Sequence, residues 1–502
     1  MNISLQLKKH ITMINNQDTL SQLPNGWELV SLPLVAYFQE GPGLRKRQFR
    51  KEGIPFLNIR TFKEEIIDKS LCQYLDKKEV QEQYSHFLLN EGDIIVSSSG
   101  TLGRTAVVRK QDLPLMLNTS VIRFRALKPN ILDQGYLRLF LKSPYFYEQI
   151  ISRCTGTAQL NYGPSHLKEM DIILPPLPEQ KRIVAKVEKL LEQVNKTREE
   201  LAKLPLLIKK FRQSVLAKAF KGELTKQDPK DELASVLLER IKKERQKLLG
   251  NKYKEPEPVN TTDLPDLPKG WEWATIDQTG LLNPRHPSNI APPNRLVSFV
   301  PMAAVDADLG VITAPETKPI SEVIKGFTHF INGDILFAKI TPCMENGKAA
   351  IAKGLVNGIG CGTTEFHVIR PLGGLLSDYI YYFVRQETFR RKAKDNMTGT
   401  VGQARVPTEF IKSEFIPVPP LLEQKRIVDE IESLFTRADE IAKAIEEAQK
   451  HCDRMTQSIL AKAFRGELVP QDPSDEPASV LLERIKTLKG GTQKPAKEKH
   501  CL

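Results

Sequence analysis

Two segments of this 502-residue sequence carry side chains of the types that contact nucleic acid. The first is the run 97–104, Ser-Ser-Ser-Gly-Thr-Leu-Gly-Arg, in which small hydroxyl residues stand beside a cation. The second is the segment 339–348, which offers two amines, a hydroxyl, an amide and a carboxylate. Such groups hydrogen-bond phosphates, and Arg, Lys, Asn, Gln and Glu also read base edges in the major groove. Both segments therefore predict a binding chemistry directed at DNA.

The candidate residues share a polar or cationic side chain in these segments, in the basic run near residue 45, or in the loop near the end of each half. In the first half they are Arg45, Lys46, Arg47, Ser98, Ser99, Thr101, Arg104, Thr157, Gln159 and Asn161. In the second half they are Lys339, Thr341, Glu345, Asn346, Lys348, Thr400, Gln403 and Arg405. Taken singly, many of them also fit an ordinary polar surface loop. As a set in equivalent loops of two halves, they favour DNA.

The patterns of known catalytic sites are incomplete in this chain. Gly347-Lys348 lacks the upstream glycine of a phosphate-binding loop, and Ala349 replaces the required hydroxyl. The eight histidines show no metal-ligand spacing. Asp334 and Lys339 resemble part of a nuclease site, but a strand-end carboxylate near a solvated lysine is the interpretation we favour. We therefore predict no catalytic residue, no metal site and no cofactor bound by this chain.

The element that must position both loops occurs twice. Residues 179–242 return as 423–486 at a constant offset, with about half of the positions identical. Glu-Gln-Lys-Arg-Ile-Val begins each copy, and the stretch 234–242 returns unchanged as 478–486. The chain is therefore expected to consist of two halves built on one plan.

Each copy is predicted to form a long helix with a coiled-coil seam, because apolar residues recur at a mean spacing of 3.5. A long amphipathic helix packed on a globular core is the alternative. Pro205 should kink the first copy alone. The predicted seam consists of Ile183, Val187, Leu190, Val194, Leu201, Leu204, Ile208, Phe211, Ile427, Ile431, Leu434, Ile441, Ile445, Met455 and Ile459.

The two seams most simply satisfy each other as an antiparallel coiled coil within one chain, with the halves related by a pseudo-twofold axis. A helix over about 183–220 would be roughly 55 Å long at 1.5 Å per residue. Successive major grooves on one face of duplex DNA lie about 34–36 Å apart. Such a helix pair is expected to act as a ruler between two DNA-reading halves.

Each half opens with a turn, Leu23-Pro24-Asn25-Gly26-Trp27 and Leu267-Pro268-Lys269-Gly270-Trp271, followed by short apolar runs. Residues 54–59, 93–97, 105–108 and 120–125 are predicted strands, and 136–152 a helix. The fold class is therefore α+β, with two globular α/β lobes separated by two long helices. The predicted domains are an extension (1–20), the first lobe (21–176), the central helical repeat (177–250), a linker (251–266), the second lobe (267–418), the distal helical repeat (419–489) and a basic tail (490–502).

Composition points to a polyanionic partner and a reducing compartment. The net charge is +12 and the isoelectric point is near 9.2. The six cysteines are scattered without paired spacing, which argues against a disulfide framework or a zinc site. We find no signal peptide or membrane span in the sequence and predict a cytoplasmic protein.

The sequence resembles the specificity subunit of type I restriction–modification enzymes over nearly its full length. The resemblance rests on the Leu-Pro-x-Gly-Trp openings, on Pro-Pro-Leu-x-Glu-Gln-Lys-Arg-Ile-Val before each long helix, and on Ala-Lys-Ala-Phe-x-Gly-Glu-Leu at its end. The segments 335–348 and Thr364-Glu365-Phe366-His367-Val368 also resemble stretches common in that family's recognition domains. The first half has Asn118-Thr119-Ser120-Val121 instead, so its target cannot be inferred from the second.

The resemblance implies a non-catalytic adaptor. Each lobe would be a target recognition domain that reads one half of a split, asymmetric DNA site, and the helices would fix the gap. The helical regions would dock two methyltransferase subunits, which bind S-adenosylmethionine, and ATP-dependent restriction motor-nuclease subunits would join. Two rivals remain: a coiled-coil tether that ignores DNA, and a nuclease with an unrecognised site.

Overall fold

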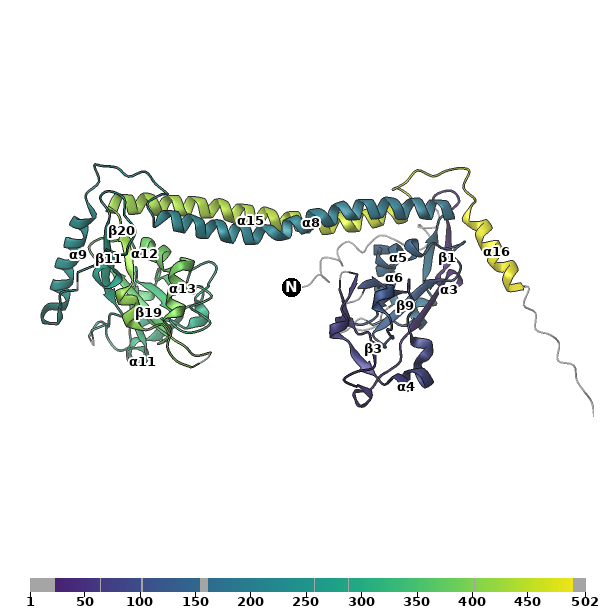
Figure 1. Cartoon of the computed structure of the whole chain (residues 1–502), viewed down its shortest axis with the longest axis horizontal. Coiled ribbons are helices and arrows are strands. Elements are labelled where there is room, and N and C mark those ends of the chain that lie inside the picture. The colour runs from purple at the N-terminus through teal and green to yellow at the C-terminus, as the bar shows by residue number, and fades with distance from the viewer. Residues whose placement is uncertain are drawn as a thin grey trace, which may run out of the picture. The chain divides into compact units, whose positions relative to one another are not determined.

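The computed structural model describes residues 23–490, except 64, 101–102, 154–160, 257, 288 and 401, with side chains described up to residue 484 and not at residue 63. The chain divides into two compact units. The first unit contains residues up to Ala202 and those from Glu447 onward, and the second contains Lys203–Glu446. Each unit therefore holds one lobe and part of each long helix (Figure 1).

Each lobe is built around a four-stranded antiparallel sheet with the same strand order. In the first lobe the order is β2 (Ala36–Glu40), β9 (Val121–Ala126), β7 (Ile94–Ser97) and β8 (Thr105–Val107). In the second lobe it is β12 (Gly280–Leu282), β19 (Phe366–Pro371), β16 (Ile335–Ala338) and β17 (Ala349–Ile351). The central strands β7 and β16 are buried along their whole length, as expected for strands covered on both faces.

The first strand of each lobe pairs antiparallel with its last strand. These pairs are β1 (Glu28–Ser31) with β10 (Asp171–Leu174), and β11 (Glu272–Thr275) with β20 (Phe415–Val418). Because the last strand leads directly into a long helix, this pairing fixes the lobe to the helical frame. The covering helices are α5 (Gln134–Lys142) and α6 (Pro144–Arg153) in the first lobe, and α12 (Ser377–Val384) and α13 (Glu387–Asp395) in the second.

Outside this common framework the lobes differ. The first lobe adds two small hairpins, β3 (Ile54–Phe56) with β6 (Gln73–Leu75), and β4 (Phe62–Lys63) with β5 (Ile66–Ile67). The second lobe adds a four-stranded sheet in the order β14 (Glu316–Pro319), β13 (Leu296–Val300), β18 (Ile359–Gly362) and β15 (Thr328–Ile331), in which β13 and β18 run parallel. The remaining short α-helices are α3 (Leu32–Val35), α4 (Lys77–Glu79), α7 (Pro164–Leu167), α10 (Ile276–Thr279), α11 (Ile320–Val323) and α14 (Thr408–Ser413).

The long helices are α8 (Leu177–Ala219) and α15 (Leu421–Phe464), and each is followed by a shorter helix, α9 (Ala234–Leu249) or α16 (Ala478–Gly490). In the first unit the start of α8 shares a core with the end of α15, and Arg198 bonds Asp453 at 2.9 Å. In the second unit the end of α8 shares a core with the start of α15, and Arg212 bonds Asp439 at 2.6 Å. Within each unit the two helices are therefore antiparallel, and the predicted α+β fold with paired long helices is confirmed.

Three residues predicted in the seam lie outside it. Phe211, Ile441 and Met455 are 44%, 55% and 41% exposed. The predicted seam was assigned from apolar residues alone. At some seam positions, however, a polar residue of one helix contacts the other helix. Arg212 takes the position next to Phe211, with its guanidinium 5.1 Å from the ring centroid of Phe435. Arg198 likewise donates to the hydroxyl of Thr456, which follows Met455.

The other predicted seam residues are buried or half-buried. Fully or largely buried are Ile183, Val187, Val194, Ile427, Ile431 and Ile445; half-buried are Leu190, Leu201, Leu204, Ile208, Leu434 and Ile459. Pro205 lies within α8, which is helical on both sides of it. Packing on the lobe adds further partners at the helix ends, since Ile183 and Ile427 belong to the lobe cores.

The repeated Glu-Gln-Lys-Arg motif ties each long helix to its lobe. Glu179 accepts a hydrogen bond from the indole of Trp27, and Glu423 from that of Trp271, both at 2.9 Å. Gln180 likewise accepts from the backbone of Asp133 at 2.8 Å and donates to the carbonyl of Pro175. These buried bonds explain why Trp and Glu return together in both copies of the repeat.

The motif's arginine joins the two copies of the repeat. Arg182 bonds Asp475 at 2.6 Å, and Arg426 pairs with Asp231. Each lobe is therefore completed by the short helix of the other copy: Ala478 donates its backbone N–H to Gly26, and Ala234 donates to Gly270, at 2.9 and 3.0 Å.

The predicted strands of the first lobe appear as β3, β7, β8 and β9. The predicted helix over 136–152 is wrong in one respect, because it is two helices separated at Ser143. Ser143 has extended backbone angles (φ −73°, ψ 151°). Pro144 accounts for the break, since a proline disfavours the helical conformation of the residue before it.

Candidate nucleic-acid interface

In the first lobe, the polar loop begins where the central strand β7 ends. Ser98 donates its N–H to the carbonyl of Ser120 and accepts from the N–H of Tyr162, at 3.0 and 3.1 Å. Its hydroxyl is buried and lies 3.3 Å from the carbonyl of Thr119. These bonds bring Ser98 beside the segment that contains Asn161, which is exposed. Ser98 thus holds the loop in place, while the half-buried Ser99 and the exposed Gly100 follow it outward.

Arg104 ends the polar loop and directly precedes strand β8. Its N–H donates to the Ser97 hydroxyl at 3.0 Å, and its guanidinium donates to the carbonyl of Ile59 at 3.2 Å. A half-buried guanidinium fixed in this way braces the loop. The candidates Thr101, Thr157 and Gln159 lie outside the described residues.

Arg45, Lys46 and Arg47 are exposed in a short 3-10 turn, η1 (Lys46–Gln48). The turn is anchored by Gln48, whose amide nitrogen donates to Glu79 at 2.6 Å and to the hydroxyl of Tyr84 at 3.2 Å. Anchoring through a neutral side chain leaves a compact group of three cations at the surface. Such a group suits phosphate oxygens.

In the second lobe, the loop after β16 pairs with the loop that closes the lobe. Lys339 donates its N–H to Glu365 and accepts from the N–H of Val406, at 2.9 and 2.8 Å. Thr341 bonds the carbonyl of Ala404 through both its N–H and its hydroxyl, each at 3.1 Å. The structure thereby brings Lys339, Thr341 and Arg405 together at one edge of the sheet. Thr400 and Gln403 are exposed in the same closing loop.

Two side chains from the Thr-Glu-Phe-His stretch hold this closing loop. Glu365 accepts a bidentate interaction from the guanidinium of Arg405, with N–O distances of 2.9 to 3.2 Å. His367 lies 2.8 Å from the carbonyl of Val406 and 3.3 Å from the amide nitrogen of Asn283. Burial lowers the pKa of His367 to about 4, so the imidazole is neutral at pH 7 and donates to Val406. Glu365 was not predicted as a site residue, although it belongs to the Thr-Glu-Phe-His stretch of the sequence.

The remaining candidates of the second lobe lie on the turn after β16. Glu345 pairs with Lys394 at 2.7 Å, and Lys348 donates to the carbonyl of Met302 at 2.9 Å, whereas Asn346 is exposed. Glu345 and Asn346 also line a groove of about 1250 Å³ within the second unit, whose other wall comes from α8 and α15. The turn with these candidate residues thus borders a groove beside the helices.

At the start of each central strand, the end opposite its polar loop, a buried aspartate pairs with a partly exposed arginine. Arg125 donates to Asp93 at 2.5 and 2.8 Å, and Arg370 donates to Asp334 at 2.7 and 2.8 Å. Asp334 is 1% exposed and also accepts from the N–H of Ile331, so its oxygens are occupied. This occupancy favours the structural interpretation of Asp334 over part of a nuclease site. Among the residues with described positions, no three His, Cys, Asp or Glu side chains are grouped to hold a metal ion.

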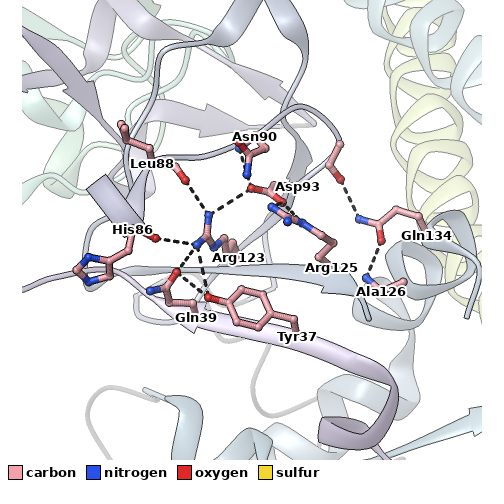
Figure 2. Close-up of polar contacts among 11 residues, drawn as sticks. Tyr37, Gln39, His86, Leu88, Asn90, Asp93, Arg123, Arg125, Ala126 and Gln134 are labelled. Carbon is pink, nitrogen blue, oxygen red and sulfur yellow. Dashed lines mark hydrogen bonds and ion pairs between the residues drawn. The ribbon is translucent and has the colours of Figure 1, made fainter. Parts of the chain in front are cut away.

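The first lobe adds a second arginine at this place, and this one is buried (Figure 2). Arg123 is 7% exposed and donates to the carbonyls of Leu88 and His86 at 2.7 and 2.8 Å. It also bonds the Gln39 side chain and lies 3.6 Å from Asp93 (Figure 2). Val368 occupies the corresponding position of the second lobe. Two arginines separated by one residue in an otherwise apolar strand were a signal for this network.

The comparisons with known proteins agree with this architecture. The sequence model of the family described as "Type I restriction modification DNA specificity domain" matches residues 24–205 and 309–449. Within the described residues, none of the helices combines the length and apolar character of a membrane span.

Curated relatives are specificity subunits. The chain is 37% identical to the type I restriction enzyme EcoAI specificity subunit of Escherichia coli over 339 residues, which cover 58% of this chain and 57% of that protein. It is 26% identical to the EcoKI specificity subunit of Escherichia coli (strain K12) over 479 residues, which cover 93% and 96%. Matches to the first relatives thus span little more than half of their length, whereas the match to the EcoKI subunit is nearly complete.

The fold is also that of a solved structure, the HsdS subunit from Thermoanaerobacter tengcongensis. The TM-score is 0.52 at 22% identity, with 89% of this chain and 98% of that chain covered. At this identity the likeness concerns the fold alone. Because the family model covers most of the chain and both lobes, the chain belongs to the type I restriction modification DNA specificity domain family.

Proposed function

We propose that this chain is the DNA-binding specificity subunit of a type I restriction–modification complex. The observation that carries the proposal is one strand framework, present twice, with different polar loops on each copy. One lobe would read one half of a split DNA site, and the other lobe would read an unlike half. Family membership supports this function for both halves.

Base and phosphate contacts would come from the side chains that the structure leaves at the surface. Arg45, Lys46 and Arg47 suit phosphates in the first lobe, and Thr400 and Gln403 suit base edges in the second. Lys339 would add a cation beside them. Arg104, Lys348 and Arg405 already bond protein groups, so their main contribution would be to hold the loops in shape.

The long helices would set the gap between the half-sites, which makes helix length the controlling variable. Seven residues rise about 10.5 Å, roughly the length of three base pairs. Removing a matched heptad from both α8 and α15 should therefore shorten the preferred gap, measured by binding to duplexes with gaps of different length. An unchanged preference would contradict the ruler.

The partners belong to the same proposal. Two methyltransferase subunits, each binding S-adenosylmethionine, would join this chain, and restriction motor-nuclease subunits would supply ATP-dependent cleavage. The chain itself would contribute recognition and no catalysis. The occupied oxygens of Asp334 support this division of labour.

Duplex binding by the assembled complex at increasing salt tests the function against its rivals. Several phosphate contacts make the logarithm of affinity fall linearly and steeply with the logarithm of salt concentration. A tether that joins proteins without DNA predicts no salt-sensitive duplex binding. A nuclease predicts metal-dependent cleavage by the isolated chain, and either result would overturn the proposal.

A further inference from the structure

The cations of the two lobes gather on different elements. In the first lobe they form the basic turn at residues 45–47. The second covering helix of that lobe, α6, carries a single cation, Arg153, which donates to the carbonyls of Gln149 and Glu169 at 3.3 and 2.9 Å. The corresponding helix of the second lobe, α13, carries four cations: Arg390, Arg391, Lys392 and Lys394.

One side of α13 is packed into the second lobe. The ring of Phe389 contacts the rings of Phe383 and Phe337, with centroids 5.3 and 5.5 Å apart. At the start of the helix, the N–H of Glu387 donates to the side chain of Gln213 in α8 at 2.7 Å. The helix is therefore held in a fixed orientation, with three of its four cations exposed on the other sides.

The helix α13 also holds the polar turn that follows β16. The guanidinium of Arg390 donates to the carbonyl of Glu345 at 3.1 Å, and the amine of Lys394 pairs with the carboxylate of the same residue at 2.7 Å. Shortly after the helix, Thr398 shares two backbone bonds with Arg405 in the closing loop, at 3.0 and 2.8 Å. The C-terminal end of α13 thus adjoins both segments whose side chains are candidates for DNA contact.

Stabilisation of the helix explains some of these cations. Lys392 and Lys394 lie in the last turn, where a positive charge interacts favourably with the helix dipole. Arg391 is exposed and lies before that turn, so the dipole does not explain it. Arg391 and Lys394 are three residues apart and are therefore neighbours on one face of the helix. The four cations outnumber the carboxylates of the helix, Glu387 and Asp395, which leaves α13 positive.

We propose that α13 is a phosphate-binding helix of the second lobe, in which Arg391 binds the DNA backbone and Lys394 exchanges the Glu345 carboxylate for a phosphate. The inference rests on the function proposed above. The ion pair is open to such an exchange, because the lysine side chain is 59% exposed and a surface ion pair contributes little to stability. A phosphate oxygen accepts from a lysine amine just as a carboxylate oxygen does.

The exchange would couple backbone contact to base reading. While Lys394 bonds Glu345, one carboxylate oxygen is occupied. Once a phosphate takes the amine, the carboxylate can accept from the amino group of a cytosine in the major groove. Glu345 would therefore become a reader only on a duplex whose backbone lies against α13. In the first lobe, where α6 carries a single cation, the backbone contact falls to the basic turn instead.

Salt titrations of duplex binding by the assembled complex test the phosphate contacts. Arg391→Gln and Lys394→Gln should each reduce the salt slope by about one unit, as the loss of one phosphate contact does. Lys392→Gln is the matched control, because it makes the same change on the same helix at an amine that bonds Glu414 at 2.6 Å, and it should leave the slope unchanged. Hydrogen exchange of the second unit should be the same in all variants, which separates lost contacts from unfolding.

Discrimination between duplexes altered in one half at a time tests the exchange. Glu345→Gln removes the reading carboxylate and should reduce discrimination at one half-site, whereas Lys394→Gln should retain it, because the free carboxylate still reads. If the ion pair instead persists on DNA and orients Glu345, Lys394→Gln loses the discrimination and keeps the salt slope. That result, or discrimination retained in Glu345→Gln, contradicts the exchange.

Other results would also overturn the inference. Salt slopes that are unchanged in Arg391→Gln and Lys394→Gln, or reduced equally in the control, contradict a specific phosphate contact at α13. Fewer bound protein subunits with an unchanged salt slope would assign this face to a protein partner. In each of these results the wild-type complex still binds duplex with a steep salt dependence, so the proposed function stands. A wild-type complex without such binding contradicts the proposed function itself.

Discussion

The two lobes share a framework and differ in nearly everything that the framework presents. Both have the same strand order, the same pairing of a buried aspartate with an arginine and the same indole-to-glutamate bond to a long helix. Among the residues that the structure describes, the parallel-paired sheet and the Glu365–Arg405 clamp on the closing loop occur in the second lobe. The shared features hold the sheet of each lobe together and attach the lobe to a long helix. Attachment is thus separated from the loops, which leaves the loops able to change.

The stretch that leads into β9 or β19 shows the same separation between framework and loops. In the second lobe, Glu365 and His367 hold the closing loop, and in the first lobe the corresponding stretch is Asn118-Thr119-Ser120-Val121. There Thr119 bonds the Asn118 side chain at 2.6 Å and the carbonyl of Pro42 at 3.3 Å. The stretch therefore supports a different neighbour, the segment that leads to the basic turn.

The largest expected effects come from breaking the shared framework. Asp93→Ala leaves the buried Arg123 without its carboxylate, which costs about 3–5 kcal/mol of unfolding free energy. Asp334→Ala removes the partner of the partly exposed Arg370, so its cost should be smaller. The loss should be larger for Asp93, because both Arg123 and Arg125 lie beside it. Urea denaturation, with hydrogen exchange to assign the unit, measures both. Equal stability of wild type and either variant would contradict the shared role.

A smaller effect should separate the lobes by pH. Burial lowers the pKa of His286, His329 and His367, all in the second lobe, and brings His367 to about 4 from an ordinary value of 6.5. The unfolded chain therefore binds protons first as the pH falls. Stability present above pH 6.5 should be lost between about 6.5 and 4, by up to about 3 kcal/mol for His367.

Hydrogen exchange of the second unit across this pH range checks the expectation. His367→Gln retains a donor for the carbonyl of Val406 and should reduce the pH dependence. If the dependence of the second unit is the same with glutamine at position 367, the neutral buried imidazole is not its cause.

The closing loop offers a sharper comparison of recognition. Glu365→Gln replaces the charged clamp on Arg405 and should weaken binding about threefold to tenfold. The loss should appear in discrimination at one half-site only, because Glu365 and Arg405 both belong to the second lobe. Affinities for duplexes altered in one half at a time measure it, with Glu409→Gln, an exposed carboxylate of the same lobe, as control. Equal losses at both halves would indicate a general effect on the complex.

The smallest effect is expected for the basic turn of the first lobe. Arg47→Ala should weaken binding similarly for all sequences and reduce the salt slope by about one unit, as the loss of one phosphate contact does. Salt titrations on matched and mismatched duplexes check this result. A loss confined to matched duplexes would assign Arg47 to a base edge instead.

Much of the framework could be predicted from sequence because repetition and periodicity encode it. The long helices and the strands around Ile94 and Val121 followed from apolar spacing. The predicted seam was wrong at Phe211, Ile441 and Met455. Polar residues such as Arg212 and Thr456 make the contacts between the helices there, and a search for apolar residues does not find them. A hydrophobicity pattern does not identify an arginine whose aliphatic carbons pack against the other helix while its guanidinium forms an ion pair.

The candidate site was harder to predict than the fold. The equivalent loops could be found because each follows the central strand of its lobe, β7 or β16. Which side chain braces a loop and which faces outward depends on contacts between distant segments, such as Arg104 with Ile59 and Lys348 with Met302. Glu365 was missed as a site residue for the same reason, since its partner Arg405 lies forty positions away.

Mapping adenine methylation is the most direct test of the central claim, that one chain reads two unlike half-sites. Genomes would be compared from cells with the chain and its methyltransferase partner and from cells lacking only this chain. The account predicts one split, asymmetric motif that is methylated only when the chain is present. Methylation that is unchanged without the chain, or a motif whose two halves are the same, would contradict it.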